Sequence, residues 1–417
     1  MTKIAILGGS AIGTPELIDA LHKYAQHPGS VPIHISLHGR TMYKLGPVAR
    51  VAALMAQPGG WLTVSATTDL AEALDGADYV INQVRIGGLE ARAHDESFPH
   101  AYGLPGEETI GPGGFANAVR TIPAVLDLMR QVERHAPTAL VLSFSNPASV
   151  IQYAVARATS LRVIGLCDMP VNMLRQISQA LEVPVAELSV DYVGMHHFGF
   201  ITRIVHAGQE VTDQLMARLE HITNLDLDVD LVRALGALPT PYFRYFVQPD
   251  RMLERQRQLT QSRAKQLMEL ETELLAEYAT AQGRPAGLSR RNANWYDFVI
   301  APVLMALIER HTATYIVNVE NRQALPWLPA DAIIETPCLL DAGQIRPLAL
   351  ASAASLSGEL RARIELNCAY EQLLVEAVLE HSDAKALRAL LMNPLIPNLT
   401  MARALLKQVW SPAQAAV

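Results

Sequence analysis

The N-terminal part of the chain alternates short apolar runs with helical patterns, and this alternation limits the folds that it can adopt. The runs are rich in Val and Ile, as expected of strands that are buried on both faces. They occupy residues 3–7, 33–37, 79–84, 139–144 and 162–166. Between the first two runs, residues 15–25 form a helical pattern with Leu17 and Leu21 on one face. The alternation predicts an α/β fold with a Rossmann-like, doubly wound parallel sheet.

A glycine-containing turn follows the first predicted strand, where sheets of this kind bind dinucleotides. Gly8, Gly9 and Ser10 stand where backbone amides and a helix N-terminus would hold a pyrophosphate. Ile12 belongs to the same turn, in which Ser replaces the middle glycine of the usual motif, so a purely structural turn is the alternative. The second strand ends without the usual ribose-binding acid, and Arg40 nearby either binds a 2′-phosphate or is solvated. The turn therefore indicates a dinucleotide, and these residues leave the choice between NAD and NADP open.

The second half has long helical patterns and few strand-like segments, and no Gly/Ser-rich linker separates it from the first. Helical patterns cover residues 250–282, 296–310 and 359–380, and strand-like segments cover residues 192–207 and 314–321. The sequence therefore predicts two domains. Residues 1–165 form a dinucleotide-binding domain, and residues 166–417 form a second, α+β domain.

The composition excludes several classes of protein. Half of the residues are apolar and only 18% are charged, which excludes a disordered chain. The 34 basic and 41 acidic residues contain no Lys/Arg block, so we expect no nucleic-acid partner. No segment reaches the roughly 18 uninterrupted apolar residues of a membrane helix, so we expect no membrane partner. The three scattered cysteines favour a cytoplasmic location over a disulfide framework.

Polar side chains follow several predicted strands, at the sheet edge where open α/β sheets bind their ligands. A lone Cys or His is usually packed in the core, but a group of polar residues at strand ends indicates a site. Cys167 together with one histidine would suit a soft divalent metal, although two ligands do not identify the metal. The group consists of Arg85, Asn146, Cys167, Asp168, His196 and His197.

Longer motifs in the chain resemble those of glycoside hydrolase family 4, the NAD- and manganese-dependent glycosidases. They are VRIGGLEARAHDESFPHAYGLPGEETIGPGGFANAVRTIP at residues 84–123, SFSNPAS, GLCDMP and GMHHFGF. The resemblance extends through PTPYFRYF at residues 239–246 to MNPLIPNLTMARALL at residues 392–406, nearly the whole chain. It implies that the second domain is catalytic, metal-binding and oligomerising, similar to that of lactate and malate dehydrogenases. It also implies a homodimer or homotetramer.

The resemblance further implies hydrolysis of 6-phosphorylated glucosides without the usual pair of carboxylates. NAD oxidises C3 of the sugar transiently, the C2 proton is removed, and the C1 oxygen leaves by elimination. Cys167 and His197 match the family's metal ligands, and Mn²⁺ or another divalent metal would stabilise the enolate. Tyr242 matches the base, which a neighbouring cation must acidify, and Asn146 matches an asparagine near substrate and metal. Without that match, Tyr242 would be interpreted as a packed aromatic residue.

The expected phosphate ligands are arginines. Arg85 and Arg92, with Asp95 and Glu96, resemble the family branch that acts on 6-phosphorylated sugars, and Arg263 occupies a further matching position. Arginine offers the planar, bidentate donors that a phosphate needs. Structural pairing with carboxylates is the alternative interpretation of these arginines.

Two residues depart from the family pattern that favours β-glucosides. His196 stands where the family has Asn, so it either contacts the substrate or competes with His197 for the metal. Asp168 follows Cys167 as in 6-phospho-α-glucosidases, in which that aspartate is the proposed general acid. The later helices resemble 6-phospho-β-glucosidases, so the sequence predicts that activity. The alternatives are a 6-phospho-α-glucosidase, a NAD-dependent hydroxy-acid dehydrogenase and a non-enzymatic dinucleotide sensor.

Overall fold

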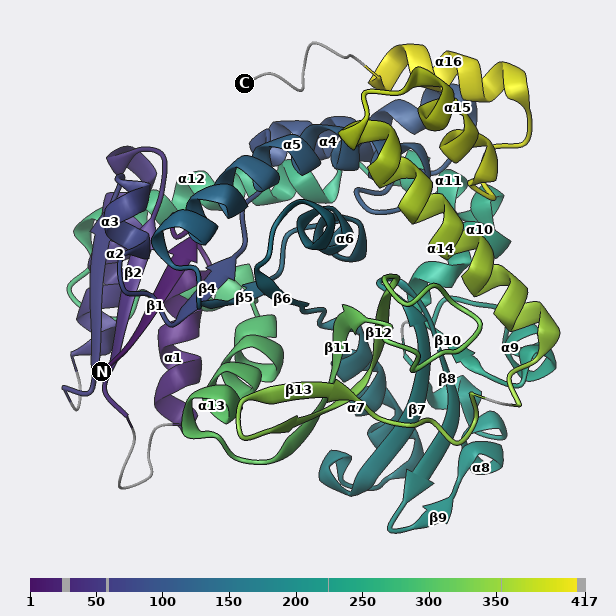
Figure 1. The fold of residues 1–417 in the computed structure, drawn as a ribbon, viewed down its shortest axis with the longest axis horizontal. Coiled ribbons are helices and arrows are strands. Elements are labelled where there is room, and N and C mark those ends of the chain that lie inside the picture. Colours follow the sequence, from purple (N-terminus) through teal and green to yellow (C-terminus); the bar gives the residue numbers. More distant parts are fainter. Residues whose placement is uncertain (25–30, 58–59, 224, 354, 411–417) are drawn as a thin grey trace.

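The computed structural model describes residues 1–24, 31–57, 60–223, 225–353 and 355–410 (Figure 1). A nine-stranded sheet runs through the molecule, and a smaller sheet lies at one side of it. The strands are β1 Thr2–Leu7, β2 Ile33–His38, β3 Leu62–Thr67, β4 Tyr79–Asn82, β5 Leu140–Ser143, β6 Arg162–Gly165, β7 Leu188–Met195, β8 Phe198–His206, β9 Gln209–Glu210, β10 Leu238–Pro239, β11 Ala313–Glu320, β12 Ile333–Asp341 and β13 Gln344–Pro347. The helices are α1 Thr14–Tyr24, α2 Met42–Ala56, α3 Leu70–Leu74, α4 Gly88–Ser97, α5 Gly111–His135, α6 Ala148–Ala158, α7 Met169–Leu181, α8 Thr212–Met216, α9 Val229–Leu235, α10 Arg244–Val247, α11 Pro249–Gln258, α12 Arg263–Thr280, α13 Ala301–Glu309, α14 Gly358–Leu379, α15 Asp383–Met392 and α16 Leu399–Val409.

Strands β1 to β6 form the parallel part of the large sheet. Their spatial order, 3-2-1-4-5-6, is that of the Rossmann fold, and β1 pairs in parallel with both β2 and β4. The predicted fold class and the five predicted strands of this half are therefore confirmed. Strand β3 is not among the predicted strands, because this edge strand exposes Thr63 and Ser65 where a buried strand would have apolar residues.

Three antiparallel strands from the second half extend the same sheet. Asn318 of β11 lies opposite Gly165 of β6, and β12 and β13 follow outward. The sequence indicates β11 but not β12, because the fully buried Glu335 and Pro337 interrupt its apolar pattern. The predicted domain boundary at residue 165 thus coincides with the end of β6, beside a strand of the other half. The division into residues 1–165 and 166–417 remains a proposal.

The segment predicted as strand-like at residues 192–207 is a hairpin of two strands, β7 and β8. Its two-residue turn consists of His196 and His197, and His197 adopts a left-handed backbone conformation with a φ of +60°. The ring of Tyr192 crosses Gly199, where a Cβ atom would overlap the tyrosine hydroxyl. That hydroxyl donates a hydrogen bond of 2.6 Å to Glu335 Oε2 on β12. The hairpin is therefore tied to the large sheet.

The helical patterns of the second half are present but divided differently. The predicted helix at residues 250–282 consists of α11 and α12, because the chain leaves the helix at residues 259–262 and Ser262 caps a new one. The pattern at residues 296–310 contains a π-helical turn, Tyr296–Ile300, before α13. The N-terminal helix is confirmed as far as Tyr24, since residue 25 of that prediction lies outside the described residues.

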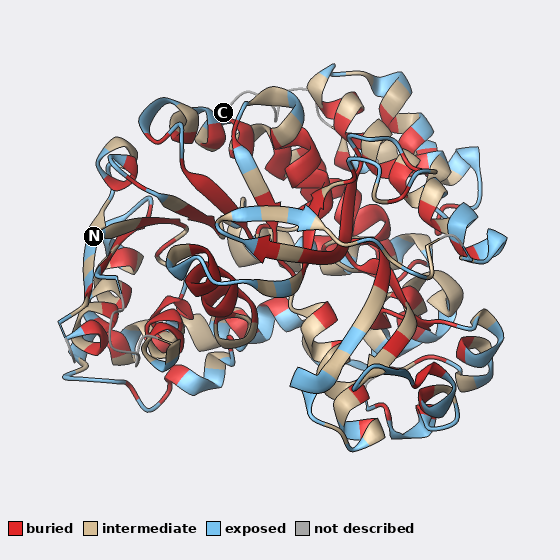
Figure 2. Ribbon diagram, turned by 60° about the horizontal axis from the view of Figure 1, so that its bottom comes forward, coloured by how far each residue is buried: buried red, intermediate tan, exposed pale blue. Residues whose placement is uncertain are grey.

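Helices cover both faces of the large sheet, so its inner parallel strands are buried on both sides (Figure 2). In β1, Ile4 and Ile6 face a core shared with α1, α2, α12 and α13. Ala5 and Leu7 face the opposite core, shared with α5, α6 and α14 to α16. Alternate residues of one strand thus belong to two separate cores, as the period of two requires. Among the described residues, no helix has the length and apolarity to cross a membrane.

Replacing Gly199 with Ala tests the crossing of Tyr192 over β8. The added methyl group would overlap the buried Tyr192 hydroxyl, so we expect the free energy of unfolding to fall by about 1–3 kcal/mol, as in other overpacked sites. Urea denaturation measures this change. Gly283→Ala is the matched control, because a Cβ atom at that exposed position meets nothing within 4 Å. Equal stability of both variants would contradict the tight crossing.

Candidate active site

Three potential metal ligands meet at the carboxyl edge of the parallel strands. Cys167 follows β6, and His196 and His197 form the β7–β8 turn. One ligand atom from each residue lies within 4.8 Å of the other two, and the three residues are only 2%, 6% and 6% exposed. The rings of His196 and His197 stack with their centroids 3.8 Å apart, and Tyr242 stacks on His197 at 3.7 Å. The fold thus brings a thiol, two imidazoles and a phenol together.

Hydrogen bonds determine which nitrogen of His197 is free. Nδ1 of His197 lies 2.8 Å from Thr109 Oγ1, and the Thr109 hydroxyl donates to a carboxylate oxygen of Glu107. Since that hydroxyl proton is committed to Glu107, the threonine oxygen accepts from Nδ1–H and leaves the Nε2 lone pair free. Burial, with a smaller effect of His196, lowers the pKa of His197 well below its usual value. A neutral imidazole with a fixed tautomer suits a metal ligand.

Cys167 has surroundings that favour the thiol unless a cation binds. Burial raises its pKa well above the usual value, and the nearby Glu335 and Asp168 raise it further. The backbone N–H of Met169 donates to its sulfur at 3.4 Å. A bound divalent cation would reverse this balance, because a coordinated thiol loses its proton. The donor set therefore fits a divalent metal.

Tyr242 and Asp168 lie beside the metal-binding group. Burial raises the pKa of Tyr242 well above its usual value, and Glu107 and Cys167 add to the effect. The protein alone therefore does not acidify this phenol, and a cation at the neighbouring Cys167 and His197 would act in the required direction. Burial also raises the pKa of Asp168, whose Oδ2 accepts a hydrogen bond of 3.2 Å from Asn172. A raised pKa suits a carboxyl group that donates a proton.

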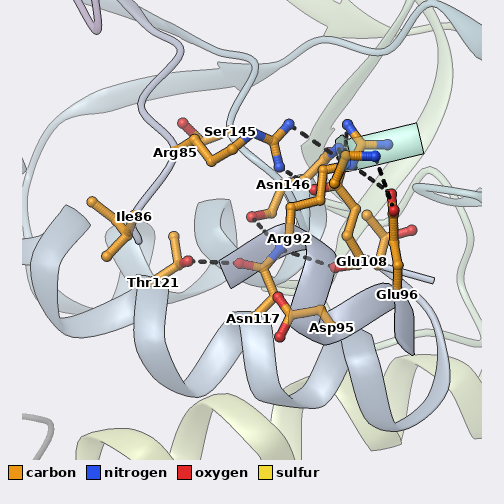
Figure 3. A network of polar contacts seen from close by, with 12 residues as sticks. Arg85, Ile86, Arg92, Asp95, Glu96, Glu108, Asn117, Thr121, Ser145 and Asn146 are labelled. Atoms are coloured by element: carbon orange, nitrogen blue, oxygen red, sulfur yellow. Dashed lines mark hydrogen bonds and ion pairs between the residues drawn. The ribbon is translucent and has the colours of Figure 1, made fainter. Parts of the chain in front are cut away.

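Arg85 and Arg92 converge on one buried carboxylate, Glu108 (Figure 3). Arg92 lies 3.3 Å from Glu108 Oε1 and also pairs with Glu96 at 2.7 Å, whereas Asn146 Nδ2 lies 3.5 Å from Glu108. Burial alone would raise the pKa of Glu108, but the two arginines hold it below its usual value. Two of the three predicted phosphate ligands, Arg85 and Arg92, thus have carboxylate partners. The side chain of Arg85 is still 35% exposed, so it remains accessible to a ligand.

Arg263 reaches this network only through the backbone of its helix. It is the exposed first residue of α12 and donates to Gln266 at 3.3 Å. The next backbone N–H, of Ala264, donates at 3.1 Å to the same Glu96 that pairs with Arg92. Glu96 therefore fixes the start of α12 beside the arginines.

The predicted dinucleotide turn is tightly packed between strands. Gly8 has a φ of +85°, and a Cβ atom on Gly9 would lie 2.9 Å from the Cβ atom of Leu37 on β2. Ser10 is half-buried, whereas Ile12 is buried and its carbonyl accepts a hydrogen bond of 2.8 Å from Tyr278. The turn leads directly into α1, as a pyrophosphate site requires. Arg40 lies exposed beyond β2.

Several residues with a role in the site are not apparent from the sequence. Arg291 is one of them, since its Cγ lies 3.3 Å from the position of a Cβ atom on Gly13, beside the dinucleotide turn. Burial lowers its pKa, and Arg263, Arg92 and Arg85 contribute to the same direction. It therefore lies beside the turn and within electrostatic range of the predicted phosphate ligands. The only signal in the sequence is the basic pair in LSRRNANW.

Arg120 is another residue that the sequence does not reveal, and it forms an ion pair with the predicted Asp95. Asp95 is fully buried and lies 2.5 Å from Arg120 Nη2, and Arg120 Nε donates to the carbonyl of Ile86 at 3.1 Å. This pair fastens α4, which carries Arg92, against α5. Asp95 thus supports the site from within the fold.

A Rossmann-type sheet with a Cys/His/His group and a stacked tyrosine at its carboxyl edge defines the class of a dinucleotide-dependent metalloenzyme. Comparison with family models identifies the class more closely. Residues 3–183 match the family 4 glycosyl hydrolase model, and residues 192–396 match the model of the family 4 glycosyl hydrolase C-terminal domain. The chain belongs to family 4 of the glycosyl hydrolases, and the resemblance found in the sequence is confirmed.

Solved structures show the same relationship. A 6-phospho-beta-glucosidase from Thermotoga maritima, solved with manganese, NAD+ and glucose-6-phosphate, is 28% identical with a TM-score of 0.88, covering 98% of this chain and 97% of its own. A 6-phospho-alpha-glucosidase from gut microorganisms, solved with NAD and glucose-6-phosphate, is 25% identical with a TM-score of 0.88, covering 99% and 98%. A lactate dehydrogenase from a deep-sea metagenome library shares the fold alone, with 12% identity and a TM-score of 0.56 over 91% and 99%. The expected dehydrogenase-like fold is thereby confirmed.

A small pocket borders the histidine pair on the side of α14. Glu371 of α14 lines it and is 6% exposed, with a hydrogen bond of 3.0 Å from Asn367. Burial raises the pKa of Glu371 to about 8, and the hydrogen bonds from Ser149 and Asn367 offset only part of this, while Glu335 adds to it. Glu371 is therefore protonated in the folded protein at neutral pH.

Replacing Thr109 with Val tests the connection between Glu107 and His197. Valine keeps the shape but cannot accept from Nδ1–H, so we expect divalent-metal affinity to fall by about 10–100-fold, the usual effect of losing such a partner. Calorimetric titration of metal-free protein with Mn²⁺ measures the change. Thr280→Val is the control, because its exposed hydroxyl bonds only to a helix carbonyl. An unchanged affinity would show that the tautomer of His197 is fixed in another way.

Replacing Glu371 with Gln tests its raised pKa. The folded protein holds a proton on Glu371 up to about pH 8, whereas an unfolded chain loses it near 4.5, so the stability contribution is lost as the pH rises between these values. The amide has no such proton, so the variant should lose less stability between pH 5 and pH 8, by up to about 1.4 kcal/mol per pH unit. Urea denaturation at both pH values measures the difference. Glu365→Gln on the exposed face of α14 is the control, and parallel pH profiles of all three proteins would contradict the prediction.

Proposed function

We propose that this protein hydrolyses 6-phospho-β-glucosides with NAD and a divalent metal as cofactors. The observation that carries the proposal is the grouping of Cys167, His197 and Tyr242 at the carboxyl edge of a dinucleotide-binding sheet. The 6-phospho-beta-glucosidase of Thermotoga maritima, which was solved with manganese, NAD+ and glucose-6-phosphate, supports this choice. The alternative is a 6-phospho-α-glucosidase, which the sequence Cys-Asp-Met-Pro and the relative from gut microorganisms support.

The residues divide the chemistry among them. A bound NAD would supply a reversible hydride acceptor for C3 of the sugar, and a bound divalent metal would supply positive charge that stabilises the deprotonated sugar. Cys167 and His197 would hold the metal. The oxygen of Tyr242 takes the proton from C2, and Asp168 gives a proton to the oxygen that leaves C1. Water then adds its oxygen to C1 while Asp168 takes a proton from it, and Tyr242 returns a proton to C2.

The substrate phosphate is recognised by arginines on two neighbouring helices. Arg85 precedes α4, Arg92 lies in α4 and Arg263 begins α12, and Glu96 connects the last two. Their guanidinium groups offer planar donors to a 6-phosphate. Asn146, within reach of both Glu108 and His196, would contact the sugar next to the metal.

The glycine turn after β1 would hold the dinucleotide. Gly8, Gly9, Ser10 and Ile12 surround the N-terminus of α1, where a pyrophosphate binds favourably. Arg40 is exposed beyond β2 and would be near the adenosine ribose, so NADP is the alternative cofactor.

We also propose that the enzyme acts in the cytoplasm as a homodimer or homotetramer. The location is supported by its three cysteines, which are all buried and unpaired, as in proteins of a reducing compartment. The assembly rests on the resemblance to the family. The division into a dinucleotide-binding domain and a catalytic, oligomerising domain belongs to the same proposal.

The decisive experiment follows both the aglycone and the C2 proton. With NAD and Mn²⁺, chromogenic 6-phospho-β-glucoside should release its aglycone faster than the α-anomer or the unphosphorylated glucoside, with little net NADH. In D₂O the released sugar phosphate should carry deuterium at C2, because Tyr242 exchanges the abstracted proton with solvent. Tyr242→Phe should bind NAD normally but lose most of kcat.

Four results would refute parts of the proposal. Stoichiometric NADH would indicate a dehydrogenase, and no release of aglycone under any metal or cofactor condition would indicate a dinucleotide sensor. Aglycone release with only protium at C2 would exclude removal of the C2 proton. Preferential release from the α-anomer would replace the β assignment with the α alternative.

A further inference from the structure

His196 has a buried ring nitrogen without a partner. The residue is 6% exposed, and its Nδ1 accepts or donates no hydrogen bond within the described part of the chain. Nδ1 lies 3.9 Å from Glu335 Oε1, whereas Nε2 lies 3.2 Å from Asn146 Oδ1. A buried polar atom without a partner needs an explanation, and an unseen ion is one of the usual ones.

The position of His196 supplies that explanation. A ligand atom of His196 lies within 4.8 Å of those of Cys167 and His197. Its ring is stacked on that of His197 with 23° between the planes, so both imidazoles face the same surroundings. Neighbouring residues of an extended strand would point to opposite sides, and the left-handed backbone of His197 prevents this.

We propose that His196 is a third protein ligand of the metal, and that it strengthens the binding of Co²⁺, Ni²⁺, Fe²⁺ or Zn²⁺ more than the binding of Mn²⁺. The inference rests on the metal-binding pair of the proposed function and adds a ligand that widens the difference in affinity between these metals. A thiolate with two imidazoles suits borderline-soft cations, whereas Mn²⁺ gains less from nitrogen and sulfur donors. Without a bound metal, Nε2 of His196 lies 3.2 Å from the side-chain oxygen of Asn146.

The surroundings of the two imidazoles support metal binding by both His196 and His197. Metal-binding histidines usually direct the second ring nitrogen, as N–H, toward a carboxylate or another buried acceptor. His197 directs Nδ1 to Thr109, which is itself bound to Glu107. In His196 the same nitrogen faces the buried Glu335, so a small movement of the ring would complete the bond and leave Nε2 free for the metal.

Replacing His196 with Phe tests the inference directly. Phenylalanine keeps a flat ring to stack on His197 but cannot bind a metal. Full-length metal-free protein is titrated calorimetrically with Co²⁺ and with Mn²⁺, and the absorption spectrum of the Co²⁺ form is recorded. We expect the variant to bind Co²⁺ at least about tenfold more weakly and Mn²⁺ with a smaller loss. The thiolate-to-cobalt band should persist because Cys167 is intact, and the d–d bands should change.

Matched variants keep each outcome decisive. His206→Asn removes a half-exposed histidine paired with Glu187 and should leave both affinities and the spectrum unchanged. His196→Asn replaces the Phe variant if melting curves show that the latter is unfolded, and the same losses are expected. Unchanged Co²⁺ affinity and unchanged d–d bands in either folded variant would overturn the inference while leaving the Cys167–His197 pair in place. Absence of the thiolate-to-cobalt band in the wild-type protein would overturn the pair as well.

Discussion

The arrangement of the site depends on one buried carboxyl group, Glu335 of β12. It accepts hydrogen bonds of 2.6 Å from Tyr192 on β7 and 3.0 Å from Asn318 on β11. Asn318 lies opposite Gly165, the last residue of β6, two positions before Cys167. One side chain therefore fixes the distance between the strand that carries the cysteine and the hairpin that carries the histidines. Burying a polar group is costly unless it is hydrogen-bonded. The hydrogen bonds of Glu335 therefore stabilise the fold and also select this one arrangement of strands.

Two regions of opposite charge surround the site. Burial raises the pKa values of Cys167 and Tyr242, and the nearby carboxyl groups of Glu107, Asp168 and Glu335 add to this effect. Basic residues gather beside the glycine turn, where burial and the neighbouring arginines lower the pKa of Arg291. The first region is stabilised by a cation and the second by an anion. Under the proposed function, a divalent metal next to a sugar phosphate and a pyrophosphate would satisfy both regions.

The sequence predicts the parallel sheet well because its strands obey a local rule. β1 in KIAIL and β5 in ALVLSF are apolar on both faces, and any strand buried between two helical layers must be. Cys167 could be predicted as a site residue for the same reason, since it directly follows such a strand. Strand β12 could not be predicted, because its buried Glu335 is stabilised by partners 17 and 143 positions away that no local pattern reveals.

The hydrogen-bonded link from Glu107 through Thr109 to His197 could not be predicted from the sequence either. It joins a loop before α5 to a hairpin 88 positions further on, and only the folded chain brings the two together. The motif GEET shows that polar residues are present, but not which ring nitrogen they engage. Arrangements of this kind depend on tertiary contacts, so they cannot be derived from periodicity or propensity.

The left-handed backbone conformation of His197 makes the fold less stable in exchange for the geometry of the site. A non-glycine residue in the left-handed region is less favourable by roughly 1–2 kcal/mol, and glycine would remove that cost at a φ of +60°. Glycine, however, would also remove the imidazole that stacks on Tyr242 and bonds to Thr109. With His197 in this conformation, two consecutive imidazoles lie face to face beside one thiol instead of on opposite sides of a strand. Strain that persists at such a position indicates a functional constraint, and under the proposed function that constraint would be the convergence of ligands on one cation.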